Sequence, residues 1–294
     1  MTASAELRSG KGHTNENFPV ASLLIRRRHR PAILAFYEFV RTADDVADHS
    51  QLAADEKIAR LDALEASLLG KDDAEPEGVK LRKVLRERGL SPQHAQDLLQ
   101  AFRRDAVKLR YADWDELFDY CRYSAMPVGR YVLEVHGESR AIWPANDALC
   151  AALQIINHVQ DCAADYRNLD RVYIPLDALA AHGLGVEALG ETHASPALTE
   201  CLRGVVDRTA VLLEQSRVFA TLVSDSGLAM EIAAIQALAE RLITILRTHD
   251  PLSEPVHLGK GTMLATAASA AALSWTGRLF RRAAPTYRPQ ERGF

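Results

Sequence analysis

The 294-residue sequence has no long apolar run and no long block of basic residues ahead of its C-terminal tail. No stretch of about twenty residues is both apolar and free of charge, so no segment is expected to cross a membrane. A formal net charge of −4 without a long basic block argues against nucleic acid as a partner. Residues 1–18 lack the apolar segment of a signal peptide, so we predict a cytoplasmic protein.

Cysteine is scarce, and its spacing fits no redox or zinc motif. The four cysteines are scattered through helical patterns, and no C-x-x-C pair occurs. We predict that they are small core residues of a protein in a reducing compartment. These residues are Cys121, Cys150, Cys162 and Cys201.

Motifs of several enzyme classes are also missing. There is no G-x-S-x-G, which argues against an α/β-hydrolase, and no G-x-G-x-x-G that follows a strand. A di-iron bundle needs Glu-x-x-His pairs on helices. Such a spacing joins Glu254 to His257, but Pro255 lies between them and prevents a regular helix.

Helical periodicity is what the sequence has instead. Apolar residues recur three and four positions apart, and we find no convincing strands. Ser91 and Pro92 are the expected N-cap and first residue of one helix, and Pro127 with Gly129 should interrupt another. The expected helices cover residues 31–48, 55–69, 79–88, 91–109, 113–137, 145–168, 196–223 and 227–249. We predict one all-α domain over residues 1–258, wrapped around a central cavity.

Two of these helices carry an unusual concentration of carboxylates. Asp44 and Asp48 are four residues apart in AFYEFVRTADDVADH, and Asp161 and Asp165 have the same spacing in a later helix. Residues four apart share a helix face, where like charges repel each other. If the two helices face each other, the carboxylates could hold Mg²⁺, which prefers oxygen ligands and binds substrate phosphates at the same time. Mn²⁺ is an alternative.

Each carboxylate pair continues a polar stripe on an otherwise apolar helix. One stripe comprises Tyr37, Arg41, Asp44 and Asp48, and the other Gln154, Asn157, Asp161 and Asp165. Arg171 and Tyr173 follow in the next loop and offer donors that suit phosphate. Such pairs also occur on solvated helix faces, so a helical scaffold without chemistry stays an alternative.

The residues quoted so far lie in segments that resemble a known family. NENFPVASLLI, FYEFVRTADDVAD, YCRYSAMPVG and NHVQDCAADYRNLDRVYIP are similar to motifs of the squalene/phytoene synthase family, the head-to-head prenyl transferases. The resemblance extends over about residues 15–250. It implies an all-α isoprenoid-synthase fold and an isoprenoid diphosphate substrate.

By position in these motifs, the resemblance also implies roles for individual residues. Catalytic, metal-binding aspartates are matched by Asp44, Asp48, Asp161 and Asp165. Positions that line the diphosphate and reaction pocket are matched by Tyr37, Arg41, Gln154, Asn157, Arg171 and Tyr173. Asn15 and Asn17 stand where many relatives have serines that contact diphosphate, and Gln160 replaces a basic residue.

Within the family, the sequence is most similar to the hydroxysqualene-forming branch of bacterial hopanoid pathways. This resemblance implies conversion of presqualene diphosphate and water to hydroxysqualene and diphosphate, without NADPH. Gln160, His158 and Tyr123 are candidates for holding the water, although a structural role is the favoured interpretation of both His158 and His136. A presqualene diphosphate, squalene or phytoene synthase that condenses two prenyl diphosphates is the alternative.

The segment 259–294 differs from the rest in composition. It is rich in small residues and then basic at Arg278, Arg281 and Arg282. Two interpretations stay open: a disordered tail, or a helix that lies on the inner face of a membrane. The second would make the membrane a peripheral partner, alongside other enzymes of the same pathway.

Overall fold

A computed structural model describes residues 24–283 of the chain. In this part the chain is helical, without strands, and one isolated bridge joins Arg110 to Val172. The first eight helices are α1 (Arg30–Ala47), α2 (Ala54–Leu69), α3 (Pro76–Arg88), α4 (Gln93–Val107), α5 (Trp114–Ser124), α6 (Met126–His136), α7 (Trp143–Gln160) and α8 (Cys162–Leu169). The others are α9 (Leu176–Ala181), α10 (Pro196–Ser216), α11 (Phe219–Leu222), α12 (Ser226–Leu246) and α13 (Lys260–Ala283). The all-α prediction is confirmed.

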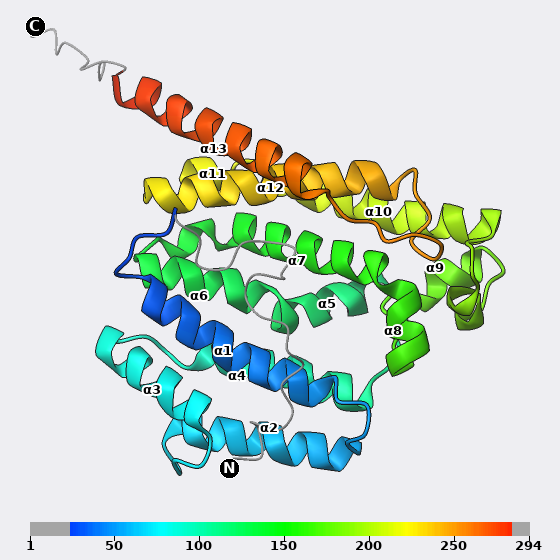
Figure 1. Ribbon diagram of the computed structural model, residues 1–294, viewed down its shortest axis with the longest axis horizontal. Coiled ribbons are helices and arrows are strands. Elements are labelled where there is room, and N and C mark those ends of the chain that lie inside the picture. Colours follow the sequence, from blue (N-terminus) through cyan, green and yellow to red (C-terminus); the bar gives the residue numbers. More distant parts are fainter. Residues whose placement is uncertain (1–23, 284–294) are drawn as a thin grey trace, which may run out of the picture.

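The helices stack in layers (Figure 1). In that view α2 and α3 lie at one side, α1 and α4 next, then α5 to α7, and α10 to α13 at the opposite side. No helix within the described residues is long and apolar enough to cross a membrane.

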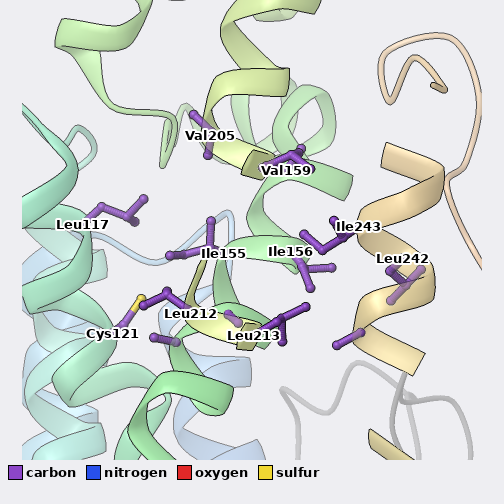
Figure 2. Close-up of a cluster of buried hydrophobic side chains, with 14 of the residues drawn as sticks. Leu117, Cys121, Ile155, Ile156, Val159, Val205, Leu212, Leu213, Leu242 and Ile243 are labelled. Atoms are coloured by element: carbon purple, nitrogen blue, oxygen red, sulfur yellow. The ribbon is translucent and has the colours of Figure 1, made fainter. Parts of the chain in front are cut away.

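Two hydrophobic cores hold the layers together. The smaller core joins α1 to α4, where side chains such as Phe39, Leu61 and Leu98 are fully buried. The larger core joins α5, α7, α10 and α12, and Figure 2 shows Ile155 and Ile156 of α7 among the side chains of these neighbours. Burial of each such side chain contributes about 1.5–3 kcal/mol to stability. A cavity lies between the two cores.

Two predicted long helices are interrupted beside the cavity. The first breaks at Ala125, between α5 and α6, because Pro127 can occupy only the first turn of a helix. The second breaks at Asp161, between α7 and α8, and this break was not predicted. The observed α4 begins at Gln93, one residue after the predicted start at Pro92, and Ser91 Oγ accepts from the amide of Gln93, as a capping side chain does.

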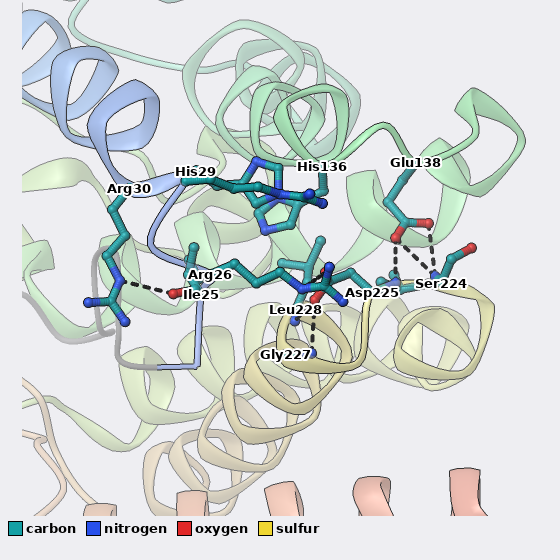
Figure 3. Close-up of polar contacts among 12 residues, drawn as sticks. Ile25, Arg26, His29, Arg30, His136, Glu138, Ser224, Asp225, Gly227 and Leu228 are labelled. Atoms are coloured by element: carbon teal, nitrogen blue, oxygen red, sulfur yellow. Dashed lines mark hydrogen bonds and ion pairs between the residues drawn. The ribbon is translucent and has the colours of Figure 1, made fainter.

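A group of polar contacts joins distant segments next to Ile25 and Leu228, two residues that line the cavity (Figure 3). Asp225 caps α12 by accepting from the amides of Gly227 and Leu228, and its other oxygen pairs with Arg26 at 2.9 Å. The carboxylate of Glu138, just after α6, accepts from the amides of Ser224 and Asp225. These contacts tie the start of α12 to the segment before α1 and to the end of α6.

The C-terminal segment, left open between disorder and a membrane-surface helix, forms α13 along α12 as far as Ala283. The guanidinium of Arg278, which had been assigned to membrane binding, instead donates to the backbone carbonyls of Val223 and Ser224. Residues 284–294 lie outside the described part of the chain, as do Asn15 and Asn17.

We predict that Gly129→Ala destabilises the protein. A Cβ at Gly129 of α6 would overlap Asn146 Oδ1 and come within 2.7 Å of Cys150 Sγ, both on α7. Overpacking of this kind costs about 1–3 kcal/mol, measurable by urea denaturation. Gly204→Ala is the matched control, because no atom lies within 4 Å of a Cβ there. It should stabilise α10 by roughly 0.5–1 kcal/mol. Equal effects at both positions would contradict the packing argument.

Candidate active site

A cavity of about 620 Å³ lies between the two cores. Its walls come from α1, α4 to α8, α11 and α12. Most lining side chains are apolar or aromatic, among them Phe36, Phe102, Phe219 and Ile232. The shape and lining are typical of a site for a largely apolar ligand with a few polar anchors.

The four predicted aspartates all line this cavity. Asp44 lies in the last turn of α1 and Asp48 caps that helix. Asp161 lies at the junction of α7 and α8, and Asp165 in the first turn of α8. The structure therefore brings the two acidic pairs, 113 or more residues apart in sequence, to one site.

The carboxylates raise one another's pKa. Burial, followed by the charge of Asp48, raises the pKa of Asp44 to about 7, against the lowering effect of Arg41. Burial, followed by the charges of Asp161 and Asp48, raises the pKa of Asp165 to about 7. The site thus carries more negative charge than its own arginines neutralise.

This charge fits a hard divalent cation, which carboxylate oxygens bind well. Among the described residues, no three His, Cys, Asp or Glu side chains converge on one metal position. An ion held by these carboxylates would complete its shell with water or phosphate oxygens, as Mg²⁺ commonly does. The arrangement suits a metal that binds together with a diphosphate.

Two arginines lie among the aspartates. Arg41 pairs with Asp44 at 2.8 Å and with Asp45 at 2.9 Å. Arg171 pairs with Asp48 at 2.5 Å and also donates to the carbonyl of Ala47 at 2.8 Å. Guanidinium groups in these positions can turn part of their donor set to a phosphate.

The remaining predicted residues can be placed individually. Tyr37, Gln154, Asn157 and Tyr173 all line the cavity. Asp45 does not, because its carboxylate turns to Arg41.

Of the three candidates for binding water, two are contradicted. Gln160 donates through Nε2 to the carbonyl of Val256, and Tyr123 lies under the guanidinium of Arg104, 4.4 Å from its centre. Neither lines the cavity, whereas His158 does. His136 lies outside it and stacks on His29 with ring centroids 4.3 Å apart, as a structural histidine.

The sequence prediction missed a fifth carboxylate, Asp105 of α4. It lines the cavity and accepts from the hydroxyls of Tyr120 at 2.7 Å and Tyr173 at 3.0 Å. Burial raises its pKa to about 6, although Arg171 lowers it. The sequence did contain a signal for this residue. Asp105 lies two helical turns after Leu98 in α4, so it occupies a position of the apolar stripe, where a carboxylate is unexpected.

Comparison with known proteins agrees with this geometry. The family model for squalene/phytoene synthase matches residues 12–262. This chain belongs to the squalene/phytoene synthase family. It is therefore an enzyme that processes isoprenoid diphosphates, in a family that generally depends on divalent metals, and the resemblance noted in the sequence is confirmed.

Named relatives match most of the chain. A hydroxysqualene synthase of Rhodopseudomonas palustris is 59% identical over 258 residues, 88% of either chain. One of Sinorhizobium fredii is 51% identical and covers 96% of this chain and 97% of its own. A solved squalene synthase of Alicyclobacillus acidocaldarius has a TM-score of 0.71 at 31% identity, covering 83% of this chain and 91% of its own. A solved dehydrosqualene synthase shares the fold, with a TM-score of 0.78 at 20% identity, covering 93% of this chain and 96% of its own.

The raised pKa values predict how metal-free stability depends on pH. A carboxyl whose folded-state pKa lies above its unfolded value of 3.8 contributes stability below about pH 4. That contribution is lost as the pH rises through about 7. Asp44→Asn should therefore stabilise the metal-free protein at pH 8 and lose this advantage near pH 4. Because the Asp44 side chain is 35% exposed, solvent screening limits the gain to about 1 kcal/mol.

Urea denaturation at both pH values, with chelator present, measures this effect. The control is Asp45→Asn. It removes the charge of the neighbouring residue, which lies outside the cavity, and weakens the ion pair of that residue with Arg41. It should not stabilise the protein at either pH. A stabilisation by Asp45→Asn equal to that of Asp44→Asn would contradict a local origin in the cavity.

Proposed function

We propose that the chain converts presqualene diphosphate and water to hydroxysqualene and diphosphate. The observation that carries this proposal is the 50–59% identity to three hydroxysqualene synthases over most of the chain. The cavity supports it, because an acidic, arginine-bearing end faces long apolar walls. Presqualene diphosphate is divided in the same way, into a charged diphosphate group and a branched apolar C30 chain.

The polar end would bind the diphosphate. Mg²⁺, or Mn²⁺ in its place, would be held by Asp44, Asp48, Asp161 and Asp165, and when bound supplies the positive charge that stabilises diphosphate as a leaving group. Arg171 is buried beside Asp48 and can donate to a phosphate oxygen from that position. Tyr37, Asn157 and Gln154 line the same region as uncharged donors.

The apolar walls would protect the cation that remains after ionisation. Aromatic rings such as Phe36, Tyr131 and Phe219 line the cavity, and electron-rich rings can stabilise a nearby cation without reacting with it. Exclusion of bulk water lets the cation rearrange before it is captured.

The cation can then take hydride, lose a proton or take water. Hydride transfer needs a bound nicotinamide, and the sequence offers no motif for one, so we expect no dependence on NADPH. Similarity to a solved squalene synthase, and to phytoene synthases over about half of the chain, supports condensation of two prenyl diphosphates as the second candidate. Asn15 and Asn17 bear on this choice, since many condensing relatives have serines there.

Incubation with presqualene diphosphate in ¹⁸O-water tests the proposal. We expect a C30 alcohol that contains the label, with no effect of added NADPH and no turnover in excess chelator. Asp161→Asn should release little diphosphate while it keeps the helical circular dichroism spectrum of the parent. Squalene that forms only with NADPH, or C30 product from farnesyl diphosphate alone, would replace the proposal with the corresponding alternative.

We also propose that α13 places the enzyme on the inner face of the membrane. Residues 261–277 of this helix contain no charged side chain. Leu264 and Leu273 are 73% exposed and Trp275 is 50% exposed, and Arg281 and Arg282 follow in the last turn. Apolar side chains beside basic residues favour an anionic lipid surface. Contact with other enzymes of the pathway stays a prediction.

Leu264→Ser combined with Leu273→Ser should weaken co-sedimentation with vesicles that contain anionic lipid. Point substitutions are preferable to deletion of the segment, because α13 covers α12 and Arg278 binds the carbonyl of Val223. Val107→Ser is the matched control, since Val107 is 64% exposed on α4, away from α13 (Figure 1). Equal binding by the double variant and its parent would contradict the membrane proposal.

A further inference from the structure

One histidine in the cavity wall is held in a defined orientation. His158 lies on α7, one turn before Asp161, and lines the cavity. Its ring stacks on Tyr173 with centroids 3.6 Å apart and planes 15° apart. Its Nε2 lies 3.1 Å from Nε2 of Gln154. The stacking fixes the plane of the imidazole and the Gln154 contact fixes its rotation, so the second ring nitrogen has a fixed direction too.

The second nitrogen of His158 is a neutral donor. Burial, together with the charge of Arg171, lowers the pKa of His158 to about 3, so the ring stays uncharged at physiological pH. With the amide N–H of Gln154 directed at Nε2, the ring hydrogen is on Nδ1. Among the described residues Nδ1 has no hydrogen-bond partner, yet it is not one of the enclosed atoms without partners. Water can therefore reach it.

Three other polar groups near His158 are committed elsewhere. The hydroxyls of Tyr120 and Tyr173 both donate to Asp105. Gln160 is turned to Val256, outside the cavity. The carboxylates of the acidic pairs would capture a cation themselves rather than deliver water to it.

We propose that Nδ1–H of His158 binds the water that becomes the hydroxyl group of the product, an inference that rests on the proposed function. One lone pair of the water oxygen accepts the hydrogen bond from Nδ1, and the other forms the C–O bond to the rearranged cation. The proton of the resulting oxonium passes to the diphosphate released in the same turnover. No oxidant or reductant is required. The Gln154 amide covers the lone pair of Nε2, which prevents the imidazole from trapping the cation.

The proximity of Arg171 places this water beside the diphosphate end. Arg171 is close enough to His158 to lower its pKa, and it pairs directly with Asp48. A water on His158 therefore lies near the released diphosphate, which is the proton acceptor. His158 would thus decide between the alcohol and the hydrocarbon that proton loss would give.

Two substitutions at His158 test the inference. His158→Phe keeps an aromatic ring against Tyr173 but removes both nitrogens, and His158→Asn returns an N–H donor near the position of Nδ1. We expect His158→Phe to release diphosphate from presqualene diphosphate at a rate within about tenfold of the parent. Its ratio of C30 alcohol to C30 hydrocarbon should fall by about tenfold, as loss of one hydrogen bond to the reacting water implies. His158→Asn should restore most of the alcohol.

His136→Phe is the matched control, because His136 is also a stacked histidine, half-buried against His29, but lies outside the cavity. Its product ratio should equal that of the parent. An unchanged ratio in His158→Phe would overturn the inference. So would a His158→Phe variant that keeps the parent's melting temperature but releases no diphosphate, because that would place His158 in ionisation. A parent enzyme that makes no C30 alcohol would instead refute the proposed function, before any variant is compared.

Discussion

The structure depends on holding several carboxylates together at one end of a mostly apolar cavity. Each carboxylate loses hydration there and repels its neighbours, which is why the pKa values of Asp44 and Asp165 rise to about 7. The pairs of Arg41 with Asp44 and of Arg171 with Asp48 offset part of this cost. Hydrophobic burial in the two cores has to offset the remainder.

The helix α1 shows how the fold meets that requirement. Phe39 and Ala43 are fully buried in the smaller core. Tyr37, Asp44 and Asp48 of the same helix line the cavity. Its far end is fixed by the contacts of Figure 3, where Arg26 pairs with the residue that caps α12. The same helix therefore connects the smaller core, the acidic end of the cavity and the start of α12, so its position and that of the aspartates cannot vary independently.

Much of this arrangement could be predicted from sequence, because it depends on local spacing. The periodicity placed most helices within a few residues of their observed bounds, and the two Asp-x-x-x-Asp pairs pointed to one site. The family resemblance added Tyr37 and Gln154 as lining residues. The predictions that failed concern residues whose surroundings depend on contacts between distant segments. Gln160 is turned away from the cavity by its contact with Val256, 96 residues away, and Asp105 meets Tyr173 across 68 residues.

The C-terminal helix illustrates a different limit. Its side chains of intermediate exposure include Met263, Ala267, Ala270 and Ser274, which recur three and four residues apart. Small residues at this spacing let α13 lie along α12, yet their composition alone resembles that of a flexible tail. Whether this segment is ordered depends on its contact with α12, and the sequence of the segment alone does not show that contact.

Polarity changes systematically along the cavity, and this order matches the stages of the proposed reaction. Carboxylates and guanidinium groups occupy the end near the last turn of α1, where a diphosphate would bind. Neutral polar and aromatic groups follow on α7 and in the loop after α8, with the hydroxyl of Tyr173 committed to Asp105. Apolar side chains such as Ile25 and Leu228 line the cavity near the start of α12, with Glu231 as a buried carboxylate among them. A cation that moves away from the acidic pairs therefore meets fewer nucleophiles as it rearranges. Its fate then depends on a few uncharged groups beside the diphosphate rather than on the cavity as a whole.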